Sequence, residues 1–250
     1  MRAPHPGQYG GPTKMEVAMT AQTRADIPVL ADDPVRNHPT RGEQLDILTT
    51  LAAAWTEDGD AVLDLGVGVG YVARMLLEKR PGVRLVGVDL KPESLAKARE
   101  TLALLSPGVA LVEGDLSAIE NLSVPAGPYA CAFTVLTFHD LTDAAKKCLI
   151  QWVAQRLAPG GVFLLMDRLR LDQPALFPLQ VALWDRMNRV YGGSMRRAET
   201  YDAYVADLDK TNTPGRLADY MTWFAEAGLS ADTVHRHGNI AILAAAKPAR

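Results

Sequence analysis

An acidic side chain and three glycines follow one another at alternating positions in this chain. Asp64 ends a short apolar segment, and Gly66, Gly68 and Gly70 come after it at intervals of two residues. Glycine lets the backbone adopt positive φ and approach a ligand closely, because it has no Cβ. A helix is predicted for residues 71–80, and its first N–H groups lack partners within the helix. This pattern is typical of a turn that binds a nucleotide.

Three further polar side chains stand where later apolar segments end. Asp89 closes the segment 83–90, Asp115 follows residues 109–112, and His139 follows residues 129–137. If these segments are parallel strands, their carboxyl ends share one edge of the sheet with the glycine turn. An imidazole there could act as a general base. The alternative for His139 is a structural histidine that is hydrogen-bonded beneath a cofactor.

The elements that must position these residues alternate between strand and helix. Short links join them, which favours a doubly wound, mostly parallel sheet with helices on both faces. Gly238-Asn239 is a tight hairpin signal, so the last strand should run antiparallel. We therefore expect an α/β fold with a seven-stranded sheet, an antiparallel C-terminal edge strand and an inserted helical cap. The expected strands are residues 61–65, 83–90, 109–112, 129–137, 162–167, 231–237 and 240–246.

The chain is expected to comprise an extension and one domain. Residues 1–40 are rich in proline and glycine and form an N-terminal extension or lid. Residues 41–250 form the domain, with the cap inserted at about 172–213. The cap is expected to shape a substrate pocket, although packing of the cap and surface charge are the alternative. The residues considered for this pocket are Trp184, Arg186, Tyr191 and Arg196.

Composition narrows the class of partner. With 48% apolar and 22% charged residues the chain has an ordinary globular balance, and its net charge of -3 gives no basic footprint for nucleic acid. No apolar run approaches the length of a membrane span, and no signal peptide is apparent, so we expect a cytoplasmic protein without membrane contacts. Cys131 and Cys148 lie in apolar runs and are expected to be reduced. A homodimer is left open.

The glycine turn alone fits two cofactors. Gly68 to Ala73 can be placed on the dinucleotide pattern G-x-G-x-x-G/A, with Asp89 about twenty residues further on. Asp64, however, stands where it could meet a cationic amino group but would sit badly near a pyrophosphate. Asp115 is an acceptor suited to an exocyclic amine. The C-terminal hairpin also differs from the second half of a dinucleotide-binding domain.

Five segments in order resemble the motifs of the class I S-adenosylmethionine-dependent methyltransferases, small-molecule type. They are Asp64 to Gly70, Val86 to Leu90, Glu113 to Leu116, Phe133 to Leu141 and Leu157 to Leu164. The resemblance implies that S-adenosylmethionine is the cofactor. It also implies that Asp64, Gly66 and Gly68 hold the methionine part, Asp89 the ribose, and Leu90, Asp115 and Leu116 the adenine. Gly70 and Thr134 complete the expected cofactor-binding set.

The expected function is transfer of a methyl group from S-adenosylmethionine to an oxygen, nitrogen or carbon atom of a small organic acceptor. Proximity and orientation would supply most of the catalysis, with His139 as the candidate base. No metal is expected, because Asp140 and Asp167 lack a third oxygen ligand nearby. The alternatives are an NAD(P)-dependent oxidoreductase, a non-catalytic cofactor-binding module, and an RNA or protein methyltransferase.

Overall fold

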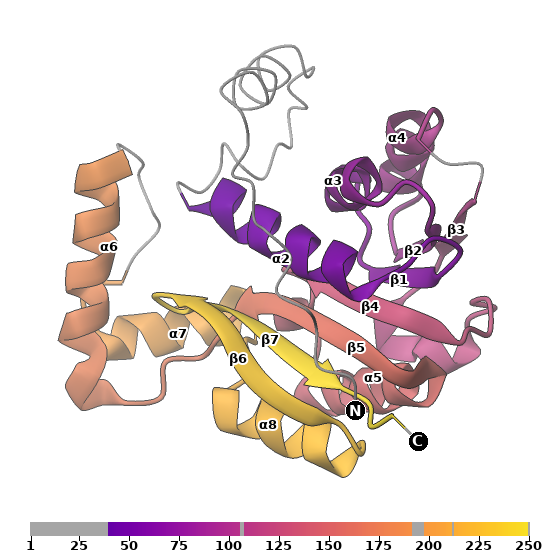
Figure 1. Cartoon of the computed structure of the whole chain (residues 1–250). Helices are drawn as coiled ribbons and strands as arrows, with labels where there is room; N and C mark the ends of the chain where they lie inside the picture. Colours follow the sequence, from indigo (N-terminus) through magenta and orange to yellow (C-terminus); the bar gives the residue numbers. More distant parts are fainter. Residues whose placement is uncertain (1–39, 106–107, 192–197, 212, 250) are drawn as a thin grey trace, which may run out of the picture. The chain divides into compact units, whose positions relative to one another are not determined.

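The structure is a computed structural model that describes residues 40–105, 108–191, 198–211 and 213–249 (Figure 1). These residues contain a seven-stranded sheet of order β3-β2-β1-β4-β5-β7-β6. The first five strands pair in parallel, and β7 is antiparallel to both β5 and β6. The expected fold class is confirmed. The strands are β1 (Ala61–Leu65), β2 (Arg84–Asp89), β3 (Val109–Glu113), β4 (Tyr129–Val135), β5 (Leu157–Arg168), β6 (Ser230–His237) and β7 (Ile240–Ala246).

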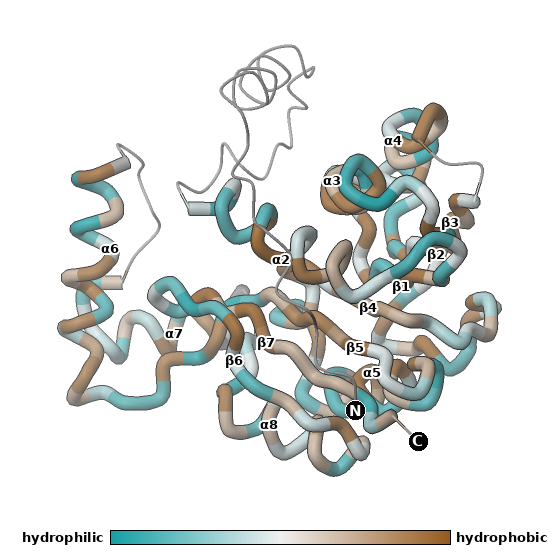
Figure 2. The backbone as a smooth tube through the Cα atoms, viewed as in Figure 1, coloured by the Kyte–Doolittle hydropathy of each residue, from teal (hydrophilic) through white to brown (hydrophobic). Residues whose placement is uncertain are grey.

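Helices cover both faces of the sheet. One apolar core lies beneath α2, α3 and α4, and a second lies beneath α5 and α8. Apolar positions recur along the central strands between these layers (Figure 2). No helix of the described residues is long and apolar enough to cross a membrane. The helices that cover the sheet are α2 (Arg41–Trp55), α3 (Tyr71–Lys79), α4 (Pro92–Leu102), α5 (Asp143–Arg156) and α8 (Leu217–Glu226).

Alternation along β1 decides which face receives Asp64. Successive side chains of a strand point to opposite faces. Val62 belongs to the core beneath α2, whereas Leu63 and Leu65 belong to the core beneath α5. Asp64 therefore points toward the α2 face. The turn that follows lies between β1 and β4, where the order of strands reverses, and ligands of such sheets bind at this point.

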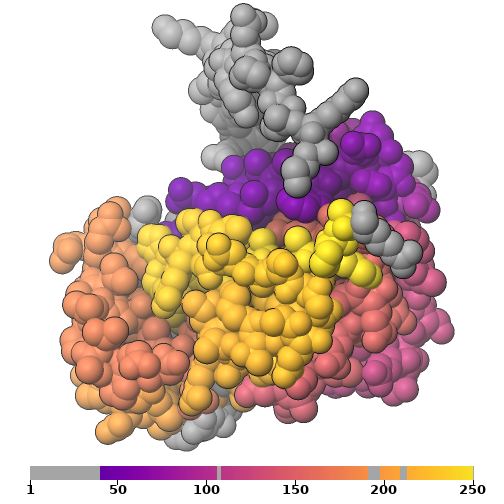
Figure 3. Space-filling view, turned by 60° about the horizontal axis from the view of Figure 1, so that its bottom comes forward, coloured from indigo at the N-terminus to yellow at the C-terminus, as the bar shows by residue number. Residues whose placement is uncertain are grey.

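The cap is an insertion between β5 and α8. It contains the short 3-10 helix η3 (Pro174–Leu176), α6 (Phe177–Tyr191) and α7 (Tyr201–Thr211). A separate aromatic-rich core joins α6 to α7. Arg170 N–H donates to the Gly215 carbonyl at 2.9 Å, so the two ends of the insertion meet. Figure 3 shows the cap beside the C-terminal hairpin and α8.

Several boundaries differ from those expected. β5 begins at Leu157, five residues before the expected strand 162–167, and carries Gly160 within it at a φ of +77°. A register shift between β4 and β5 accommodates this kink. The 3-10 helix η1 (Leu116–Asn121) lacked a periodic signal and was not expected. The predicted extension or lid at residues 1–40 falls almost wholly outside the described residues, and the domain boundaries remain a prediction.

Candidate active site

The glycine turn after β1 has the backbone that its sequence predicts. Gly66, Gly68 and Gly70 have φ values of +83°, +53° and +81°, in the left-handed region that favours glycine. A Cβ on Gly66 would collide with the Thr137 hydroxyl, whereas no described atom lies within 4 Å of a Cβ on Gly68. Gly70 is the N-cap of α3. The turn is therefore tight against β4 on one side and open on the other.

Asp89 at the end of β2 fixes this turn. Its Oδ2 accepts the Gly68 N–H at 2.7 Å, and its Oδ1 accepts the Lys91 N–H at 3.0 Å. Each carboxylate oxygen has two lone pairs, so both can accept a further donor from a ligand. Leu90, the next residue, is 58% exposed and provides an apolar surface beside the carboxylate.

Asp64 has a buried carboxyl group with one oxygen that accepts no hydrogen bond from the described residues. Its side chain is almost fully buried, and its Oδ2 has no hydrogen-bond partner among the described residues. Burial raises the pKa of Asp64 well above its ordinary value, and the neighbouring charge of Asp89 adds to the rise. A positively charged ligand group at this point would satisfy the oxygen and favour the ionised form.

Two polar residues of α2, the helix on the face toward which Asp64 points, were missed from the sequence. Arg41 Nε and both amide atoms of Gln44 are buried without partners in the part of the chain that the structure describes. Buried polar groups in proteins are normally hydrogen-bonded, and each unmet group costs about 1–3 kcal/mol. Positions 41 and 44 stand at helical spacing ahead of the apolar stripe that begins at Leu45. The signal that could have revealed them is that these two polar residues extend the apolar side of the helix toward its start.

The end of β5 brings charged side chains close to Arg41. The pKa of Arg41 is lowered to about 10, first by burial and then by Arg168, while Asp167 acts in the opposite direction. Arg168 shares the strand face of Val162, Leu164 and Met166, which belong to the core beneath α2. Arg41 and Arg168 thus bring two guanidinium groups close together at the end of β5.

His139 forms a dyad with Asp167. Its Nδ1 lies 2.6 Å from Asp167 Oδ1, and its backbone N–H donates to Asp167 Oδ2 at 2.8 Å. Both side chains are buried. When Nδ1–H donates to the carboxylate, the proton-accepting atom of the neutral ring is Nε2, which lies 3.6 Å from exposed Asp140. This arrangement orients an imidazole as a base, as in hydrolase triads.

The segment that carries His139 is held from the cap side. Thr213 N–H donates to the His139 carbonyl at 2.7 Å, and its hydroxyl donates to the Leu141 carbonyl. Lys146 is fully buried, and its ammonium donates to Leu141 O, Asp143 Oδ1 and Thr213 O. The return of the chain from the cap therefore fixes the loop of the dyad.

Leu136 shows strain at the end of β4. Its φ of +53° lies in the left-handed region, which is uncommon for a bulky side chain. Such residues persist where the surrounding structure holds them, and they cluster at functional sites. Leu136 lies three residues before His139 and one before Thr137, which contacts the glycine turn. The strain thus marks the loop between the glycine turn and the dyad.

Other expected cofactor residues have partners within the protein. Asp115 Oδ1 accepts the Ser117 N–H at 2.8 Å and caps η1, while Leu116 is buried in the core. Thr134 donates its hydroxyl to the Leu65 carbonyl at 2.7 Å. Asp115 retains a second oxygen for a ligand. The cofactor roles of these residues remain predictions.

The residues predicted for the substrate pocket are scattered. Trp184 is buried in the core of the cap against Phe177, and Arg186 is exposed on α6. The side chain of Tyr191 and the whole of Arg196 lie outside the described residues. Among the described residues no group of three or more histidine, cysteine, aspartate or glutamate side chains could hold a metal ion.

Comparison with known proteins identifies the same region. A family model described as a methyltransferase domain matches residues 62–161. The chain is 34% identical over 140 residues to a carboxy-S-adenosyl-L-methionine synthase of Chromohalobacter salexigens, covering 54% of this chain and 50% of that protein. It is 34% identical over 125 residues to a trans-aconitate 2-methyltransferase of Azoarcus sp., covering 50% and 46%.

The fold has solved counterparts. An O-methyltransferase family protein from Burkholderia thailandensis superposes with a TM-score of 0.62 at 18% identity, covering 87% of this chain and 58% of that one. The chain spans about half the length of the two curated relatives above. The family model spans the elements that carry the glycine turn and Asp89.

Proposed function

We propose that the chain is a class I S-adenosylmethionine-dependent methyltransferase and that it transfers a methyl group from S-adenosylmethionine to a small organic acceptor. The observation that carries this proposal is the unpartnered Asp64 carboxylate beside the glycine turn. The amino acid part of S-adenosylmethionine has an ammonium group that would pair with this oxygen. A dinucleotide would instead bring a pyrophosphate, which offers the Asp64 oxygen no positively charged partner.

The buried groups of the site fit the cofactor. Asp64 would accept the ammonium group, and the unmet donors of Arg41 and Gln44 would meet the carboxylate of the methionine part. Asp89 would accept the ribose hydroxyls while it holds the Gly68 N–H. Leu90 would cover the adenine, in keeping with its exposure. Asp115, Leu116, Gly66, Gly70 and Thr134 complete the proposed cofactor site.

The acceptor end of the reaction would use the dyad. S-adenosylmethionine supplies a methyl group already activated on sulfur, so the protein mainly has to orient the acceptor. Asp167 would keep the His139 ring in place, and Nε2 would take a proton from an acceptor hydroxyl or amine. A general base contributes about 10²–10⁴-fold when the acceptor must lose a proton.

The proposal also includes the class of acceptor, the cellular location and the oligomeric state. The net charge of -3 supports a small-molecule acceptor over nucleic acid. A cytoplasmic location and a homodimer remain parts of the proposal. Trp184 and Arg186 would act on the acceptor through the shape of the cap.

A second candidate function is the synthesis of carboxy-S-adenosylmethionine, the activity named for one relative. The guanidinium of Arg168 beside that of Arg41 favours it, because a second cation there could pair with an additional carboxylate on the cofactor. Mass spectrometry of the adenosyl ligand that the purified protein retains would separate the two functions. Only the second predicts the carboxylated form.

Isothermal titration with S-adenosylmethionine tests the cofactor site. Asp89→Ala should weaken binding strongly, since it removes the acceptor for the ribose and the partner of Gly68. Glu100→Ala, an exposed acidic residue on α4, is the matched control and should leave the affinity unchanged. Equal affinity of the Asp89 variant and the wild type would contradict the assignment. Binding of NADH in place of S-adenosylmethionine would favour the oxidoreductase alternative.

A further inference from the structure

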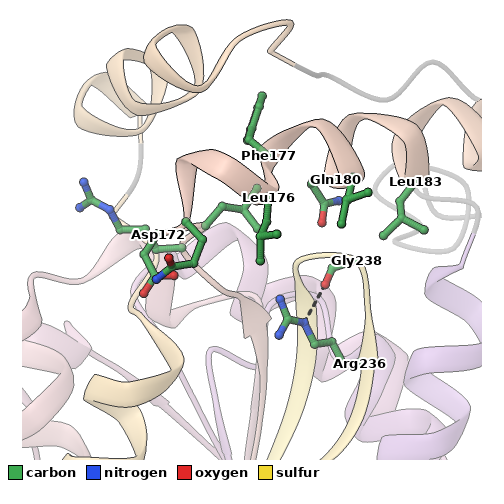
Figure 4. Close-up of a pocket in the computed structure, with 11 residues that line it drawn as sticks. Asp172, Leu176, Phe177, Gln180, Leu183, Arg236 and Gly238 are labelled. Atoms are coloured by element: carbon green, nitrogen blue, oxygen red, sulfur yellow. Dashed lines mark hydrogen bonds between the residues drawn. The ribbon is translucent and has the colours of Figure 1, made fainter.

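A cavity of about 500 Å³ lies between the cap and the C-terminal hairpin, outside the residues assigned to the cofactor. Its volume falls within the range of about 300–1,000 Å³ that is usual for small-molecule sites. It is lined by Arg170 to Gln173, by Leu176, Phe177, Leu179, Gln180 and Leu183, and by Arg236 and Gly238. In Figure 4, Gln180 and Leu183 extend from α6 toward the hairpin turn with Arg236 and Gly238.

Gln180 is the polar group that points to a ligand. The side chain is 94% buried. Its amide Nε2 has no hydrogen-bond partner among the residues that the structure describes. If Gly238 carried a Cβ, the nearest atom to it would be this nitrogen, at 3.0 Å. The amide of Gln180 therefore lies directly against the hairpin. A buried donor of this kind is satisfied by an acceptor oxygen.

The charges of the lining favour an anion. Arg170 and Arg236 contribute two positive charges, against one negative charge from Asp172. Arg236 donates Nε to the Gly238 carbonyl at 2.9 Å, which uses one of its five donors and fixes the guanidinium at the turn. A carboxylate is the acceptor that matches the planar donors of a guanidinium together with an amide.

The remaining wall is apolar and open. Leu176, Leu179 and Leu183 are 57%, 64% and 41% exposed, although they stand at helical spacing along one side of η3 and α6. Phe177 points away from the cavity in Figure 4 and packs in the core of the cap. The three leucines offer a surface that an apolar ligand body would cover.

The cavity lies close enough to the dyad for one ligand to reach both. Arg170 follows Asp167 by three residues, which limits the separation of their Cα atoms to about 11 Å. Leu169 N–H donates to the Asn239 carbonyl at 2.6 Å, so the hairpin turn is anchored beside the same stretch of chain. An elongated molecule could place one end in the cavity and the other near His139.

We propose that this cavity binds the carboxylate end of an elongated acid with an apolar body, through Arg236 and Gln180. That this acid is the methyl acceptor rests on the proposed function. Its nucleophilic atom would then lie at the end away from the carboxylate that the cavity holds.

Three probes of nearly equal size test the site by isothermal titration of the full chain: 4-phenylbutyrate, 4-phenylbutanol and 4-phenylbutylamine. The acid should bind at least about tenfold more tightly than the alcohol or the amine. Arg236→Gln and Gln180→Met should each weaken the acid about tenfold and leave the alcohol unchanged. Arg99→Gln on α4 and Gln151→Met on α5, both exposed, are the matched controls and should change nothing.

Three results would overturn the proposal. These are equal affinities for the acid and the alcohol, acid binding that neither variant weakens, and competition of the acid with S-adenosylmethionine for one site. Arg236 is on the surface, so its variant still tests the site even if the buried Gln180 variant does not fold. Titration with S-adenosylmethionine alone is separate, since its failure would overturn the proposed function and leave the acid site standing.

Discussion

Replacing Asp64 by asparagine removes a buried ionisable group and nearly preserves its volume. Burial raises the pKa of Asp64 well above 3.8, so above about pH 4 the unfolded chain releases this proton while the folded chain retains it. By linkage, the free energy of unfolding then falls as the pH rises, by up to about 1.4 kcal/mol per pH unit. The decline ends at the pH where Asp64 ionises in the folded protein.

The variant lacks this decline. Relative to the wild type, Asp64→Asn should therefore gain up to about 1.4 kcal/mol per pH unit within that window. For a domain of this size the corresponding gain in Tm is about 3–6 °C per pH unit. Thermal unfolding of both proteins without ligand, at one-unit steps from pH 5 to pH 8, measures it. Parallel Tm curves for the two proteins would refute the assignment of a retained proton to Asp64.

Binding of S-adenosylmethionine should change in the opposite sense. A cationic ligand group favours ionised Asp64, so binding releases a proton and the wild-type affinity rises with pH, by up to about tenfold per unit. Asp64→Asn should abolish this dependence and lose a charge-assisted bond of about 1.5–3 kcal/mol. Titration in two buffers of different ionisation enthalpy counts the released protons. Unchanged affinity of the variant at pH 8 would refute the ammonium contact.

Four further substitutions test the site. Gly66→Ala should lower the free energy of unfolding by at least about 2 kcal/mol in urea denaturation, because alanine meets both strained backbone and a side chain. Gly68→Ala meets only the backbone strain and should lose about 1 kcal/mol. Asp167→Asn should reduce kcat about 10²–10⁴-fold without changing the affinity for S-adenosylmethionine, because His139 loses its orientation. Lys146→Met should lower the free energy of unfolding by about 3 kcal/mol and speed hydrogen exchange in the loop of the dyad.

Neighbouring residues provide controls for these outcomes. Asp140→Asn replaces the exposed carboxylate beside the same imidazole and should leave kcat within about twofold. Lys147→Met removes an exposed ion pair with Glu226 and should lose less than about 1 kcal/mol. Equal losses in the two lysine variants would contradict the role of Lys146, and equal losses in the two glycine variants would contradict the close contact at Gly66.

The sequence was sufficient for the parts of the fold that follow local patterns. Alternating apolar strands and helices indicated the doubly wound sheet, and Gly238-Asn239 indicated the antiparallel hairpin. The turn at Gly66 to Gly70 was recognisable because positive φ restricts the choice of residue to glycine. Family motifs then distinguished S-adenosylmethionine from a dinucleotide, which periodicity alone could not do.

Pairings across the sheet were beyond local patterns. Asp167 was visible as a carboxylate at a strand end, but its contact with His139 depends on the register of β4 against β5. Arg41 was absent from the prediction, since a charged residue at a helix start usually faces water. Trp184 was predicted to line the pocket, yet the aromatic core of the cap gives the same sequence signal. Packing between elements decides such cases.

The hydrogen bond between the Arg170 N–H and the Gly215 carbonyl joins the two ends of the cap. About forty residues leave the sheet after β5 and return to nearly the same point, which is the contact between Arg170 and Gly215. The glycine turn and β1 to β4 all precede Arg170 in the chain. Replacing the insertion would therefore leave these elements covalently unchanged. Under the proposed function, replacement of this one segment would change the acceptor, while the residues proposed to bind the methyl donor stay the same.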